Sequence, residues 1–216
     1  MQQPSGQVFI VSAARTPIGR FGGSLSTVPA TELGATAIRA AVERAGLDPA
    51  TVEVDDVLMG QVLQAGVGQA PARQAALKAG LPDGTSATTI NRVCGSGLKA
   101  IMLAAAEIRA GDAELVIAGG MESMNQAPFL LHGARFGLRL GNAQLIDSTV
   151  NDGLWCSIEG CHMGTHAERV AISDHVSRED QDAFALGSHQ KAIAAIDAGR
   201  FDAEMAPVTV RDAKGR

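Results

Sequence analysis

The segment TSATTINRVCGSGLKAIMLAAAEIRAGDAELVIAGG runs from Thr85 to Gly120 and is the most informative part of this sequence. Its first residues are typical of a β-strand and lead into Cys94. A long alanine-rich run then predicts a helix that ends at Gly111, and the apolar run from Leu115 to Ala118 predicts a second strand. We therefore expect a strand–helix–strand unit with Cys94 at the junction between the first strand and the helix.

That junction is a favourable place for a reactive thiol. Unpaired backbone N–H groups and the positive end of the helix dipole favour a thiolate there. Gly95 and Gly97 would let a substrate carbonyl approach the backbone, where N–H groups can hold an oxyanion. The alternative is a small buried core residue, the commoner fate of a free cysteine. A hydrolase nucleophile elbow is excluded, because Arg92 and Ser96 stand where that motif needs glycine.

Composition limits the class of protein. The 216 residues are 46% hydrophobic and 19% charged, an ordinary globular balance. The net charge of −5, without a basic block, argues against a nucleic-acid partner, and no apolar run is long enough to span a membrane. Three cysteines form no disulfide framework, which predicts a reducing, cytoplasmic compartment. Residues 1–6 lack the pattern of a targeting leader.

The remaining segments alternate between strand and helix patterns, which is typical of a layered α/β fold with a largely parallel sheet. The helix after Cys94 is apolar nearly all round, so we expect it to lie between two layers. The expected elements outside the Thr85–Gly120 segment are a strand at 8–14, a helix at 29–45, a strand at 57–63, a helix at 70–79, a helix at 164–171, a helix at 177–198 and a strand-like run at 201–210.

A group of cysteines and histidines near residue 160 raises the question of a metal site. Cys156, Cys161, His162 and His166 offer ligand-type atoms. Gly164 weakens the case for a single helical face, and two cysteines separated by four residues are not a usual zinc spacing. We therefore expect no metal. The alternative is that residues 156–163 line an apolar channel.

Four motifs together resemble the thiolase family, and its biosynthetic branch in particular. The motif around Cys94 is the most specific of them, and degradative members tend to carry proline where His162 stands. The four motifs are Ser12-Ala-Ala-Arg-Thr-Pro-Ile-Gly19, Asn91-Arg-Val-Cys94-Gly-Ser-Gly-Leu-Lys99, Gly119-Gly-Met-Glu-Ser-Met124 and Cys161-His-Met-Gly164.

The resemblance implies a layered α/β fold built as the first of two βαβαβ core copies, with a buried helix after Cys94. Residues 1–123 would form this N-terminal core domain. Residues 124–216 would form part of an inserted loop domain that serves tetramerisation and coenzyme A binding. The second core copy would be absent from the chain.

The resemblance also implies a reaction. Cys94 would be acylated by acetyl-CoA, and a second acetyl-CoA would condense with it to give acetoacetyl-CoA and free CoA, or the reverse thiolysis would occur. Leu154, His162 and Met163 would line the pantetheine tunnel, and CoA thioesters would be substrates, with no prosthetic group. Residues 127–144 resemble the loop through which the family's dimers pair, which predicts a homo-oligomer.

The family's acid–base residues are expected in the second core copy: a Gly-His-Pro histidine and a cysteine in a Gly-rich loop. No Gly-His-Pro sequence occurs here. This leaves an alternative open, a non-catalytic fragment that binds acyl-CoA or another subunit. A decarboxylating ketoacyl synthase of the same superfamily is a further alternative, which the residues around Cys94 and His162 fit less well.

Overall fold

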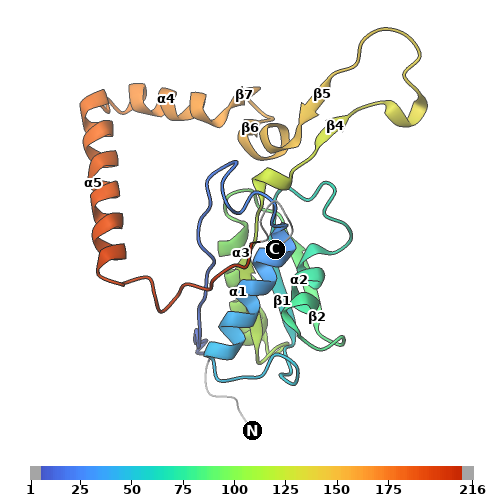
Figure 1. Ribbon diagram of the computed structural model, residues 1–216, viewed down its shortest axis with the longest axis vertical. Helices are drawn as coiled ribbons and strands as arrows, with labels where there is room; N and C mark the ends of the chain where they lie inside the picture. The colour runs from blue at the N-terminus through green and yellow to red at the C-terminus, as the bar shows by residue number, and fades with distance from the viewer. Residues whose placement is uncertain (1–5, 211–216) are drawn as a thin grey trace.

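The computed structural model describes residues 6–210. Its centre is a parallel three-stranded sheet in the order β2–β1–β3 (Figure 1). The strands are in register, so that Gly60, Ile90 and Gly120 lie side by side at the carboxyl edge of the sheet. The elements of this part are α1 (Ala30–Arg44), β1 (Asp56–Gly60), α2 (Pro71–Ala79), β2 (Ser86–Ile90), α3 (Ser96–Ala110) and β3 (Val116–Gly120).

Helices cover both faces of the sheet. Alternate residues of a strand point to opposite faces, so Val57 and Met59 of β1 face one way and Leu58 the other. Val57 and Met59 belong to a buried cluster with α1 and α2, to which Ile38 and Ala75 contribute. Leu58 belongs to a second cluster, with Ala100 and Ala104 of α3. The layered α/β fold with a parallel sheet is thus confirmed.

The start of α3 lies against the carboxyl ends of β1 and β3. A Cβ atom added to Gly60 would lie 2.7 Å from the backbone carbon and from the Cβ of Ser96. A Cβ added to Gly120 would lie 3.5 Å from the Cα of Gly97. The glycine that ends β1 therefore permits a helix-to-strand approach that no larger residue would allow.

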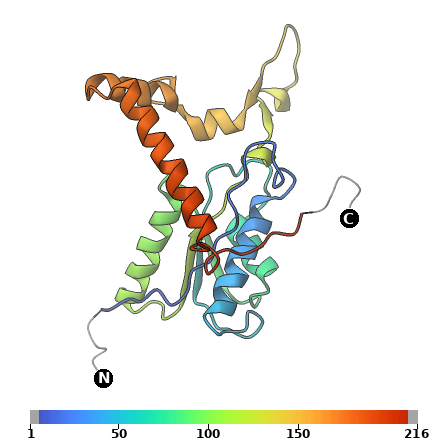
Figure 2. The same ribbon diagram turned by 60° about the vertical axis from the view of Figure 1, so that its left-hand side comes forward.

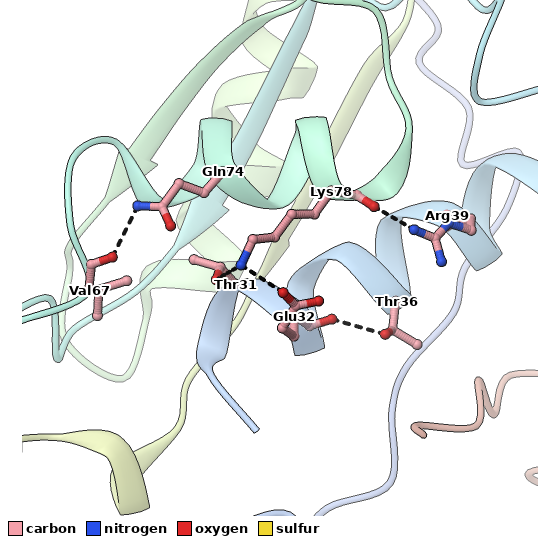
Figure 3. Close-up of polar contacts among 7 residues, drawn as sticks. All are labelled: Thr31, Glu32, Thr36, Arg39, Val67, Gln74 and Lys78. Carbon is pink, nitrogen blue, oxygen red and sulfur yellow. Dashed lines mark hydrogen bonds and ion pairs between the residues drawn. The ribbon is translucent and has the colours of Figure 1, made fainter. Parts of the chain in front are cut away.

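Polar contacts join α1 to α2 (Figure 3). The Lys78 ammonium lies 2.7 Å from Glu32 Oε1 and donates to the Thr31 hydroxyl at 3.0 Å. The Arg39 guanidinium donates to the carbonyl of Ala79 at 3.1 Å and also to that of Lys78. These last carbonyls of α2 have no partner within the helix, so Arg39 caps it.

At the amino ends of the strands, Asp55 joins the residue before β1 to the residues before β3. Its Oδ2 accepts hydrogen bonds from the backbone N–H groups of Glu114 at 2.8 Å and Leu115 at 3.0 Å. The bond from Leu115, and then that from Glu114, lower the pKa of Asp55. Asp55 thus holds the first residues of β3 beside the first residues of β1.

Most of residues 124–200 extends away from this core (Figures 1 and 2), although Ser148 and Thr149 are buried. The segment forms a long β4–β5 hairpin, a second small hairpin and two helices that contain no buried residue. The elements are η1 (Met124–Gln126), β4 (Phe129–Leu131), η2 (Ala134–Phe136), β5 (Leu145–Asp147), η3 (Thr149–Leu154), β6 (Trp155–Cys156), β7 (Cys161–His162), α4 (Met163–Ser173) and α5 (Arg178–Asp197).

The chain returns to the core after α5. The Arg15 guanidinium lies 2.5 Å from Glu204 Oε1 and 5.0 Å from the centre of the Phe201 ring. Backbone hydrogen bonds join Arg15 to Glu204 and Ala206, and Ala206 is buried. Among residues 6–210, no helix is both long enough and apolar enough to cross a membrane.

Three expectations differ from the structure. Residues 8–14 are not a strand, and Phe9, Ile10 and Val11 are exposed, because no strand among the described residues pairs with them. The run at 201–210 makes only the bridge between Arg15 and Met205. The helix α3 is covered on one face only, and its other face is exposed where a second layer was expected; this face contains Leu98, Ile101 and Met102.

We predict that Gly60→Ala lowers the free energy of unfolding by about 2 kcal/mol, because the new methyl group would push α3 off the sheet. Gly97→Ala is the matched control. A Cβ at Gly97 would lie 3.7 Å from the carbonyl oxygen of Gly119, an ordinary contact. Urea denaturation of the purified chains measures both. Equal stability of the two variants would contradict the prediction.

Candidate active site

Cys94 lies just beyond the carboxyl edge of the sheet, four residues after the end of β2 and two before the start of α3. The residue is exposed, which excludes the buried core alternative for this chain as described. Gly95 is the N-cap of α3 and takes no side-chain cap. Ligands of parallel α/β sheets bind at this edge, so Cys94 is well placed to meet one.

Two polar side chains hold the loop that carries Cys94. The buried hydroxyl of Ser96 accepts from the Arg92 backbone N–H at 2.8 Å and donates to the Val93 carbonyl at 2.6 Å. The side-chain oxygen of Asn91 accepts from the Val93 N–H at 3.0 Å. Both sides of the turn before Cys94 are therefore fixed by hydrogen bonds.

Val93 adopts a strained conformation. Its φ is +49°, in the left-handed region that a β-branched residue rarely enters. Its side chain is 53% exposed, so burial of that side chain does not explain the conformation. Strain of this kind costs on the order of 1–3 kcal/mol and is characteristic of active-site loops. The hydrogen bonds from Asn91 and Ser96 supply the constraint that maintains it.

The two glycines that follow Cys94 have different surroundings. Gly97 faces the backbone at the end of β3, where a Cβ would lie 3.7 Å from the Gly119 carbonyl oxygen and 3.8 Å from the Gly120 nitrogen, both ordinary contacts. A Cβ added at Gly95 would contact only the Arg92 carbonyl oxygen, at 3.4 Å. The close approach of α3 to the sheet therefore depends on Gly60 and not on Gly97.

Glu122 is a site residue that the sequence analysis missed. Its carboxylate accepts from the backbone N–H of Val62 at 2.8 Å and of Leu63 at 3.2 Å. Burial raises the pKa of Glu122 and outweighs the two backbone hydrogen bonds, which lower it. The carboxylate thus holds the loop after β1 to the loop after β3. The sequence signal was an acidic residue directly after an apolar strand that ends in two glycines.

Gln61 directly precedes Val62, whose N–H bonds to Glu122, and its side chain is almost fully buried. Its side-chain nitrogen donates to the Leu63 carbonyl at 3.1 Å. Its Oε1 atom is buried and has no hydrogen-bond partner among the described residues.

The three residues predicted to line a pantetheine tunnel lie in the extension. Leu154 ends η3, which reaches the core where Gly153 approaches the Leu63 side chain. His162 is the N-cap of α4, and its Nδ1 accepts from the Gly164 N–H at 3.0 Å. Met163 is exposed at the first position of α4. Within residues 6–210, no hydrogen bond joins these side chains to Cys94.

One group of side chains has atoms suited to a metal. Glu159, Cys161 and His166 each place one ligand-type atom within 4.8 Å of the other two. The group lies between β6 and the first turns of α4.

Comparisons with known proteins agree with this picture. The family model described as "Thiolase, N-terminal domain" matches residues 8–216. An acetyl-CoA acetyltransferase of Pseudomonas aeruginosa is 56% identical over 208 residues, which is 96% of this chain and 52% of that protein. One from Cupriavidus necator is 58% identical over the same shares. A probable acetyl-CoA acyltransferase of Staphylococcus epidermidis is 51% identical over 97% of this chain and 52% of its own length. The chain spans about half the length of these curated relatives.

We predict that Val93→Gly raises the free energy of unfolding by about 1 kcal/mol, since relief of the strain exceeds the entropic cost of glycine. Val93→Ala is the control, because it removes the same branch and keeps a Cβ at positive φ. Iodoacetamide should alkylate Cys94 more slowly in the glycine variant, whose loop can relax. A glycine variant less stable than the alanine variant would overturn the strain argument.

Glu122 gives a prediction about pH. An acid whose pKa is higher in the folded state binds more protons when folded, so stability falls as pH rises above its ordinary value of 4.5. Glu122→Gln removes this titration. The stability of the parent chain relative to the variant should therefore fall with rising pH above 4.5 and then level off. Urea denaturation at a series of pH values measures it. A difference that rises with pH would contradict the assignment.

Proposed function

Because the chain belongs to the thiolase family, we propose that Cys94 is the nucleophile of an acyl transfer between CoA thioesters. The observation that supports this most directly is the exposed Cys94 in a strained loop beside the start of α3. The relatives named acetyl-CoA acetyltransferase suggest the acetyl group as the one transferred.

The first step is an exchange of thioesters. The Cys94 thiolate attacks the carbonyl carbon of acetyl-CoA, a new C–S bond forms, and CoA leaves as a thiolate that takes up a proton. Backbone N–H groups at the start of α3 are suited to stabilise the negative oxygen that develops. The loop hydrogen bonds hold the sulfur in place before the substrate arrives, which lowers the entropic cost of the attack.

The second step is a condensation. A second acetyl-CoA loses an α-proton, and its carbanion attacks the acetyl-Cys94 carbonyl, which gives acetoacetyl-CoA and regenerates the thiolate. The reverse direction is thiolysis. General acid–base groups contribute about 10²–10⁴ in rate. The proposed condensation therefore needs a base that removes the α-proton of the second acetyl-CoA.

Leu154, His162 and Met163 are proposed to contact the pantetheine arm of CoA. They lie on η3 and at the start of α4, above the same end of the sheet (Figure 1). An apolar side chain, a thioether and an imidazole suit a narrow channel for a mixed polar and apolar arm. No prosthetic group is needed. The cytoplasmic compartment and the division at residue 123 remain predictions.

We also propose that the chain forms a homo-oligomer. The hairpin of β4 and β5 extends from the core, and Phe136, Leu138 and Leu140 are exposed near its tip. The exposed face of α3, with Leu98 and Met102, is a second apolar surface. Exposed apolar patches of this kind are characteristic of contacts between subunits. They favour, as the second candidate function, a module that binds acyl-CoA or another subunit without catalysis.

Intact-protein mass spectrometry after incubation with acetyl-CoA tests the proposed nucleophile. We expect one acetyl adduct on the parent chain, because only Cys94 combines exposure with a constrained loop at a helix N-terminus. Cys94→Ser should remove the adduct, whereas Cys156→Ser and Cys161→Ser should keep it. An adduct that persists in Cys94→Ser would refute the assignment, and no adduct on the parent chain would favour the non-catalytic module.

A further inference from the structure

A second cluster of reactive side chains lies outside the proposed acyl-transfer site. The Cys161 sulfur in β7 lies 3.5 Å from Nε2 of His166 in α4. The Nδ1 atom of the same ring lies 3.8 Å from Oε2 of Glu159, in the turn between β6 and β7. The sulfur and the ring are half-buried, and Glu159 is exposed.

Two arrangements use these three residue types. In a catalytic relay the imidazole stands between the thiol and the carboxylate, which then lie on opposite sides of the ring. In a metal site the three ligand atoms converge on one point. Here the sulfur contacts Nε2 and the carboxylate lies nearest Nδ1, contacts that by themselves would also suit a relay. One ligand-type atom from each residue nevertheless lies within 4.8 Å of the other two, which a metal site requires and a relay does not. This mutual proximity favours the metal site.

The distance between Cys161 Sγ and His166 Nε2 matches the separation of two ligand atoms on one zinc ion. Zinc binds thiolate sulfur at about 2.3 Å and imidazole nitrogen at about 2.0–2.1 Å, in tetrahedral geometry, which separates the two ligand atoms by about 3.5 Å. The Cys161–His166 distance is 3.5 Å. Thiolate and imidazole ligands select zinc and related ions over magnesium or calcium.

Arg169 is a further side chain in contact with this cluster, through Glu159. Its guanidinium donates to Glu159 Oε2 at 2.6 Å. Oε2 is also the carboxylate oxygen nearest His166. A carboxylate has about four lone-pair sites on its two oxygens, so this bond orients Glu159 and leaves other sites for a metal ion. The arginine side chain is itself 56% exposed, so it can also turn away.

We propose that Glu159, Cys161 and His166 bind a single Zn²⁺ or similar divalent transition-metal ion, with the fourth position open to solvent. The ion would join the turn before β7 to the first turn of α4. His162 and Met163 lie between two of its ligands in sequence, so it would also fix the orientation of that segment. The proposal does not depend on catalysis by Cys94.

Zinc affinity of the purified chain, measured by competition with a chromophoric chelator, tests the proposal. Cys161→Ser and His166→Gln should each weaken binding by about 100-fold or more, since loss of even a supporting residue costs about 10–100-fold. Cys156→Ser is the matched control, because Cys156 pairs with Cys161 in the same hairpin but is outside the cluster. Its affinity should match that of the parent chain.

Cobalt substitution gives a second readout. Co²⁺ bound to the parent chain and to Cys156→Ser should show a thiolate-to-metal charge-transfer band, and Cys161→Ser should lack it. Far-UV circular dichroism establishes that each variant is folded, and Cys161→Ala replaces any serine variant that is not. Equal zinc affinity in the parent chain and the folded Cys161 and His166 variants would overturn the proposal, as would a cobalt band that survives without Cys161.

Discussion

The close approach of α3 to the carboxyl ends of β1 and β3 is the constraint on which this structure depends. It exists because Gly60 has no side chain where Ser96 and Gly97 lie. Once the helix start is fixed there, the buried Ser96 hydroxyl can bond both sides of the turn before Cys94. A packing feature of the core therefore constrains the loop that carries an exposed cysteine.

The local elements were predictable because each has its own signal in the sequence. The run before Cys94, the alanine-rich helix and its stop at Gly111 appear as β2 and α3 with Gly111 as C-cap. The helix predicted to open at Ser177 is α5, and the Ser177 hydroxyl accepts from the Asp180 N–H as a capping residue should. The family assignment also followed from short motifs, and the match over residues 8–216 confirms it.

Features that depend on distant partners were not predictable. Residues 8–14 have strand character, but a strand needs a neighbour, and none among the described residues pairs with them. Phe184 and Ile196 are large apolar residues of the helix predicted at 177–198, yet both are exposed. Glu122 gains its role from Val62 and Leu63, 60 and 59 residues away in the chain. The approach of Glu159 to Cys161 and His166 likewise required the folded hairpin, because spacing on one helix argued against a metal.

We propose that the packing of α3 on Gly60 prepares Cys94 for acyl transfer. The most direct measurement is the rate constant for transfer of the acetyl group from acetyl-CoA to Cys94 in Gly60→Ala, with alkylation of Cys156 as an internal reference. We expect the rate of acetyl transfer to Cys94 to fall at least about tenfold while the rate of Cys156 alkylation is unchanged, because a small displacement of a reacting atom is costly. Unchanged acetylation of Cys94 in a folded Gly60→Ala chain would contradict it.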